Sequence, residues 1–147
     1  MILPIFVIDA FTDKVFGGNP AAVIPVSSPL EVEVMQSIAS ENNLSETAYV
    51  DISSMPFSIR WFTPTVEVDL CGHATLATAR VLFDFYLSED MEEISFSSRW
   101  LLKLSFLQPE KNKVNKIKRY IFKERFFIFS FFLIIKQFNT CIFFIYQ

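Results

Sequence analysis

The sequence predicts an α+β domain over residues 1–107, and three observations lead to that prediction. Short apolar segments bounded by turn residues recur through this part of the chain, as expected of strands. Two longer segments have the start signals or the composition of helices. The second of these is rich in small and apolar residues on all sides, which indicates a helix surrounded by other elements rather than the outer helix of a doubly wound sheet.

The chain opens with two predicted strands and a turn between them. Residues 2–8 form a short apolar run, and residues 21–26 form another. Between them lies Gly17-Gly18-Asn19-Pro20, in which adjacent glycines and a proline are a strong turn signal. The two strands are therefore expected on either side of this turn.

The first predicted helix follows and runs to about Asn42. Ser28 is suited to the N-cap, a proline follows it at the first helical position, and Glu31 is placed to close a capping box. Apolar residues spaced four apart predict one buried stripe along this helix. The stripe consists of Leu30, Val34 and Ile38.

Three more strands and the second helix are predicted in the middle of the chain. Residues 45–52 are strand-like, residues 57–62 alternate as in a half-buried strand, and residues 65–70 add another. The second helix opens at Gly72 and runs to about Tyr86. Its many alanines suit a central helix that is packed closely by its neighbours.

Residues 108–147 are predicted to form a separate, compositionally biased tail. Residues 1–98 carry 14 acidic and 3 basic side chains, whereas residues 99–147 carry 2 acidic and 10 basic ones. Of the 37 residues from Lys111 onward, 27 are Phe, Ile, Lys, Asn or Tyr, with no lasting helical or strand period. Adenine- and thymine-rich codons encode these five residue types, so we interpret the tail as translated non-coding or frame-shifted sequence, not a native domain.

Composition and motifs argue against several classes of function. The two cysteines, Cys71 and Cys141, have no metal-binding spacing, so a reduced cytoplasmic protein without metal or cofactor is expected. No phosphate-binding or dinucleotide motif is present, and no nucleic-acid partner is expected. The apolar run at residues 126–135 is ten residues long, whereas a membrane-spanning helix needs about 20. No membrane span is therefore predicted.

Glu46 and His73 are the residues that suggest chemistry. His73 is the only histidine, and it falls in the first turn of the second predicted helix. Free N–H groups and the helix dipole favour negative charge at such a place. A neutral imidazole there can relay a proton while a nearby carboxylate acts as the base. Residue type alone leaves open a solvated glutamate and a histidine that only caps or packs.

Four segments of the predicted domain resemble the phenazine-biosynthesis-like (PhzF) isomerase family. They are DAFT at residues 9–12, GGNPAAV at 17–23, NLSETA at 43–48 and WFTPTVEVDLCGHAT at 61–75. The resemblance implies a diaminopimelate-epimerase-like fold, in which each of two lobes wraps a mixed sheet around a central helix and the active site lies between the lobes. It also implies a cofactor-independent isomerase, whose better-known member moves a double bond in a dihydro-hydroxyanthranilate.

The resemblance also implies roles for individual residues. It makes Glu46 the catalytic acid/base and His73 an assisting proton-handling group. Substrate-binding or supporting roles are implied for four others: Asn19, Ser45, Gly72 and Ala74. Cys71 has no role in a reaction that uses a carboxylate, so it is interpreted as a packing residue. The expected partner is a small carboxylate-bearing substrate.

The sequence departs from the family pattern after the second helix. No glycine follows Gly72, and a family-like strand at residues 94–98 runs into Arg99 where a glycine turn is expected. We therefore expect a truncated member that lacks the second lobe and is inactive alone. Two other functions stay open: a non-catalytic, self-associating module such as a homodimer, and membrane-surface binding through residues 111–125 and the aromatic tail.

Overall fold

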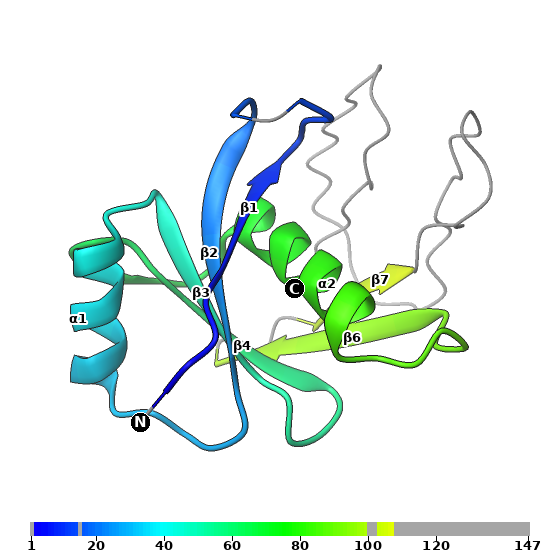
Figure 1. The fold of residues 1–147 in the computed structure, drawn as a ribbon. Helices are drawn as coiled ribbons and strands as arrows, with labels where there is room; N and C mark the ends of the chain where they lie inside the picture. Colours follow the sequence, from blue (N-terminus) through cyan, green and yellow to red (C-terminus); the bar gives the residue numbers. More distant parts are fainter. Residues whose placement is uncertain (1, 15, 100–102, 108–147) are drawn as a thin grey trace, which may run out of the picture.

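The computed structural model describes residues 2–14, 16–99 and 103–107, which form one mixed sheet and two helices (Figure 1). The predicted α+β class is confirmed. The strands are β1 (Phe6–Ala10), β2 (Asn19–Val26), β3 (Glu46–Asp51), β4 (Phe57–Phe62), β5 (Glu67–Val68), β6 (Glu93–Ser98) and β7 (Lys103–Leu107). The helices are α1 (Val32–Asn42) and α2 (Gly72–Phe85).

The order of the strands in the sheet is explained by the positions of the two helices in the sequence. Within the described residues the strands lie in the order β1-β2-β3-β4-β6-β7, and β5 pairs with β4. The β2–β3 and β4–β6 pairs are parallel, and the other pairs are antiparallel. Parallel neighbours need a crossover. α1 provides it between β2 and β3, and α2 provides it between β4 and β6.

The two helices cover opposite faces of the sheet. Along β4, Ile59 and Trp61 pack in the cluster that contains α2, whereas Phe62 packs in the smaller cluster with α1. This division follows the alternation of side chains along a strand. The larger cluster also draws residues from β2, β3, β6 and β7, so the sheet curves around α2, as predicted for the central helix (Figure 1).

The predicted start of the first helix is wrong. α1 begins at Val32 with Glu31 at the N-cap position, and no side chain caps it, so the capping box from Ser28 does not form. The reason is that β2 pairs with β3 as far as Val26, and the chain needs the following residues to cross to the other face. The predicted stripe is confirmed in part: Leu30 and Ile38 pack against the cluster that contains the buried Met35 and Ala39, whereas Val34 is 38% exposed.

Two strand predictions are corrected as well, and one strand was missed. β1 begins at Phe6 instead of residue 2, because its register with β2 ends where Phe6 pairs with Val23. Residues 65–70 contribute only the two-residue β5, since the Thr63 hydroxyl accepts the N–H of Val66 and closes a turn. β7 was not predicted.

The predicted tail at residues 108–147 lies outside the described residues. So do the basic and aromatic segments that would bind a membrane surface. Within the described ranges, no helix is both long enough and apolar enough to cross a bilayer.

Candidate active site

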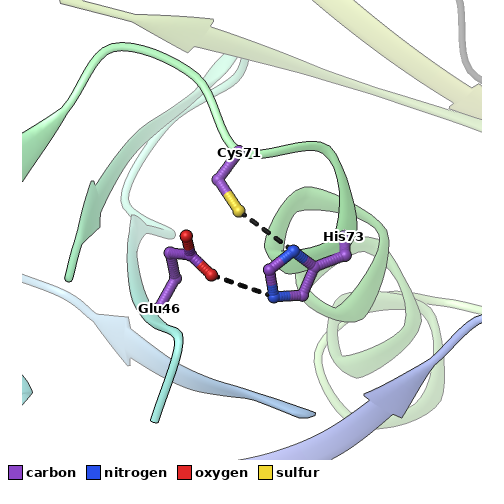
Figure 2. Close-up of side chains that lie close together, drawn as sticks. All are labelled: Glu46, Cys71 and His73. Atoms are coloured by element: carbon purple, nitrogen blue, oxygen red, sulfur yellow. Dashed lines mark hydrogen bonds and ion pairs between the residues drawn. The ribbon is translucent and has the colours of Figure 1, made fainter. Parts of the chain in front are cut away.

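Glu46 and His73 meet where β3 and α2 begin (Figure 2). The Glu46 Oε2 atom lies 3.1 Å from His73 Nε2. Both groups are largely withdrawn from solvent, with side-chain exposures of 20% and 10%. The two side chains therefore lie together at the N-terminus of α2.

The backbone places Glu46 by a helix end followed by strand pairing. α1 ends at Asn42, and the C-cap residue Asn43 has a left-handed conformation (φ 50°) and donates its N–H to the carbonyl of Ala39. Asparagine tolerates this conformation better than most residues. The chain then enters β3, whose parallel register with β2 sets Glu46 opposite Ala21. The pairing of β3 with β2 therefore fixes the backbone position of Glu46, from which its carboxylate extends.

The first turn of α2 holds His73, whose ring contacts Cys71 and Glu46. Thr75 donates both its hydroxyl and its N–H to the carbonyl of Cys71, at 2.6 and 3.1 Å. Ala74 is fully buried beneath the sheet. These contacts fix the turn, because the residues on both sides of His73 cannot move without breaking them.

Cys71 is part of the site, and its interpretation as a packing residue was incomplete. Its Sγ lies 3.3 Å from Nδ1 of His73 (Figure 2). Burial raises the pKa of the Cys71 thiol to about 12; nearby N–H groups oppose that rise, and the Glu46 carboxylate adds to it. The thiol is therefore protonated at neutral pH. Its S–H can be donated to Nδ1, in the tautomer with the ring proton on Nε2, or to the Glu46 carboxylate. Its position two residues before the only histidine was the available signal.

Two atoms of the site lack an aligned hydrogen bond. Among the described residues, Glu46 Oε2 and His73 Nε2 are buried without a hydrogen-bond partner. They lie 3.1 Å apart, but the angle between them does not suit a hydrogen bond. Buried polar atoms in native proteins usually have partners. Both atoms are thus available to a third group.

The four residues predicted to bind substrate have different surroundings in the structure. A side chain on Gly72 would meet no atom within 4 Å, so the helix end is open there. Ala74, in contrast, is fully buried. Asn19 and Ser45 hydrogen-bond to each other at 3.3 Å. Of the four, Gly72 is the one at which the structure shows open space.

Glu46, Cys71 and His73 also have the donor atoms that a metal ion could use. One ligand atom from each lies within 4.8 Å of the other two. The spacing of the cysteines in the sequence did not indicate this group, because Glu46 is brought in by the fold.

The fold is that of one lobe of the diaminopimelate-epimerase-like isomerases, with the Glu46–His73 pair at the N-terminus of its central helix. A family model described as "Phenazine biosynthesis-like protein" matches residues 8–117, so the chain belongs to the PhzF family. The match ends ten residues beyond the boundary predicted at residue 107.

Relatives with similar sequences are named isomerases. An uncharacterized isomerase of Pseudomonas aeruginosa is 62% identical over 82 residues, which cover 56% of this chain and 32% of the relative. An uncharacterized isomerase of Halalkalibacterium halodurans is 48% identical over 126 residues, covering 78% of this chain and 48% of the relative. The chain thus spans at most about half the length of these relatives.

Solved structures share the fold. A PhzF family phenazine biosynthesis protein of Enterococcus faecalis has a TM-score of 0.71 and 49% identity, covering 76% of this chain and 42% of that one. A predicted epimerase of Pseudomonas aeruginosa, with 23% identity, has a TM-score of 0.59, which shows a likeness of fold alone.

Proposed function

We propose that Glu46 and His73 are the proton-transfer pair of a cofactor-independent isomerase that acts on a small carboxylate-bearing substrate. The observation that carries the proposal is the 3.1 Å contact between Glu46 Oε2 and His73 Nε2 at the start of α2. The isomerase names of the relatives support it.

In the proposed reaction, Glu46 takes a proton from a carbon next to the substrate's unsaturated system. The double bond shifts, and the proton returns at another carbon, so no atom is gained or lost. In the tautomer with its ring proton on Nε2, His73 accepts the Cys71 S–H at Nδ1. That Nε2–H and the open N-terminus of α2 beside Gly72 then stabilise the negative charge that develops.

The proposal includes a second lobe, as the length of the relatives suggests. A base must lie about 3 Å from the proton it removes, and another group must hold the substrate in place. Good orientation of reactants accounts for roughly 7–11 kcal/mol of barrier lowering. Glu46 and His73 lie on one side of the expected cleft between the lobes. We therefore expect no isomerase activity from the 147-residue chain alone.

Solvent-deuterium incorporation into a dihydro-hydroxyanthranilate tests the proposal. The chain is joined to the second lobe of a close relative, and Glu46→Gln in that protein should lower label uptake by about 10²-fold or more. Glu41→Gln, an exposed change near the end of α1, is the matched control and should retain uptake. Uptake that survives Glu46→Gln removes the assignment. Uptake by the unjoined chain that depends on Glu46 shows that one lobe suffices.

Self-association is a second candidate, favoured by the outer edge of the sheet. β1 is a terminal strand among the described ones, and Val7 on β1 and Phe85 at the end of α2 are 61% and 64% exposed. An open apolar edge is a template for pairing with another chain. Sedimentation should then show a size that rises with concentration and a shift towards monomer on Val7→Lys. A monomer at all concentrations would exclude it.

A further inference from the structure

We propose that Glu46, Cys71 and His73 form a binding site for a thiophilic divalent cation, of which Zn²⁺ is the best match. Their ligand atoms lie within 4.8 Å of one another, and both Cys71 and His73 are buried. Sulfur, imidazole nitrogen and carboxylate oxygen are the three donor types that bind zinc in proteins. Three protein ligands leave the fourth position of a tetrahedral ion open.

The distances are close to those of a zinc site. Tetrahedral zinc at its usual bond lengths sets neighbouring donors roughly 3.4–3.6 Å apart. Cys71 Sγ lies 3.3 Å from His73 Nδ1, and Glu46 Oε2 lies 3.1 Å from Nε2. Each ring nitrogen therefore already has one other donor at nearly the spacing of a zinc site: Nδ1 has Cys71 Sγ, and Nε2 has Glu46 Oε2. The third donor must approach by about 1 Å, which rotation of the Glu46 side chain or the ring can provide.

The charges balance when the ion binds. Zn²⁺ replaces the thiol proton of Cys71, which passes to the buffer, and the new sulfur–zinc bond leaves a thiolate ligand. The thiolate and the Glu46 carboxylate together neutralise the two positive charges, while His73 binds as neutral imidazole. A buried site without net charge avoids the cost of an unpaired buried ion.

A second, independent observation also points to a ligand at this place. Glu46 Oε2 and His73 Nε2 are buried without a hydrogen-bond partner among the described residues. They face each other at 3.1 Å in a geometry that no hydrogen bond satisfies. A cation bound beside these atoms, with the ring proton on Nδ1, would give both of them a partner. Figure 2 shows the carboxylate and the thiol turned towards the same ring.

Titration of the 147-residue chain with Co²⁺, followed by displacement with Zn²⁺, tests the site without any substrate. We expect one ion per chain and a thiolate-to-cobalt charge-transfer band that Zn²⁺ removes. Cys71→Ser should abolish the band and weaken zinc binding at least tenfold. Cys141→Ser is the matched control, since these are the two cysteines of the chain, and it should keep the band.

A second variant and a second measurement keep the test decisive if Cys71→Ser does not fold. Glu46→Gln should weaken zinc binding about tenfold or more, whereas Glu41→Gln should not. The ring signals of the sole histidine should shift on zinc addition in the unaltered chain. Absence of one-to-one binding, a band that depends on Cys141, or ring signals that do not move would overturn the proposal.

If the proposed isomerase function also holds, a bound ion occupies both proton-transfer groups and Zn²⁺ is an inhibitor. That consequence rests on the proposed function, whereas the binding experiment does not. A chain that binds zinc but shows no Glu46-dependent label uptake after completion would refute the isomerase role alone. The opposite result would refute the metal site alone.

Discussion

Glu46 Oε2 lies 3.1 Å from Nε2 of His73, although one residue opens a strand and the other lies in the first turn of a helix much later in the chain. Core packing explains the contact. Ala48, just after Glu46, and Ala74, next to His73, belong to the same buried cluster. Because small residues let β3 and α2 approach closely, the longer side chains at the ends of these elements meet.

His73→Gln should lower kcat in the enzyme completed with a second lobe. General acid–base groups contribute about 10²- to 10⁴-fold, and the loss should fall mainly on kcat because the ring acts on developing charge. Steady-state kinetics at neutral pH measure it, with Arg80→Gln on the exposed side of α2 as the control. A raised KM with unchanged kcat would instead assign His73 to substrate binding.

Gly18→Ala and Gly72→Ala should have opposite effects on stability. Gly18 has φ of +75°, and an added Cβ would clash with the Ala10 carbonyl oxygen. We expect a loss of about 2 kcal/mol or more. An added Cβ on Gly72 meets nothing within 4 Å. Since alanine favours helices, Gly72→Ala should be neutral or stabilising by up to about 1 kcal/mol. Urea denaturation of the chain distinguishes the two, and equal effects would contradict the turn geometry.

The parts of the fold that depend on local pattern could be predicted. Residues 57–62 alternate so regularly that both ends of β4 agree with the prediction. The start of α1 could not be predicted, because the local signals at Ser28 compete with strand pairing that extends to Val26. β7 has no distinctive pattern, and its pairing with β6 depends on residues outside it.

The candidate site was predictable in its two main residues but not in its third. The motifs around Glu46 and His73 point to the pair, and the helix start gives His73 its setting. Cys71 was assigned to packing because the family resemblance gives it no role in a reaction that uses a carboxylate, and sequence does not show where its side chain points. Only the folded turn reveals that Sγ lies 3.3 Å from Nδ1 and that Glu46 stands beside both.

Ala77→Leu should destabilise the lobe, whereas Arg80→Leu on the same helix should not. Ala77 is buried where α2 packs against the sheet. Adding volume to a packed core typically costs about 1–3 kcal/mol. Arg80 is exposed, and its ion pair with Asp84 contributes about 0.5 kcal/mol at most. Thermal unfolding of both variants measures the difference. Equal melting temperatures would show that α2 is not tightly enclosed.

The Glu67–Arg60 pair should make stability depend on pH. Arg60 donates to both carboxylate oxygens of Glu67 at 2.7 Å, and Arg99 donates to one at 2.8 Å. The hydrogen bond from Arg60 is the main reason that the pKa of Glu67 is lowered from its ordinary value. A lowered folded-state pKa stabilises the fold above the unfolded value, roughly 4.3, and this contribution is lost as the pH falls through the folded value.

Glu67→Gln should therefore cost about 1–3 kcal/mol at pH 7, since hydrogen bonds to charged groups are worth that much when partly buried. The difference in free energy of unfolding between the unaltered protein and Glu67→Gln should narrow below about pH 4, where the Glu67 carboxylate begins to take up a proton. Urea denaturation at a series of pH values measures this difference. Asp84→Asn, which removes a more exposed carboxylate paired with Arg80, is the control and should change stability by less than about 0.5 kcal/mol. A Glu67→Gln deficit that is the same well below pH 4 as at pH 7 would mean that shape, and not the ionised pair, accounts for the loss.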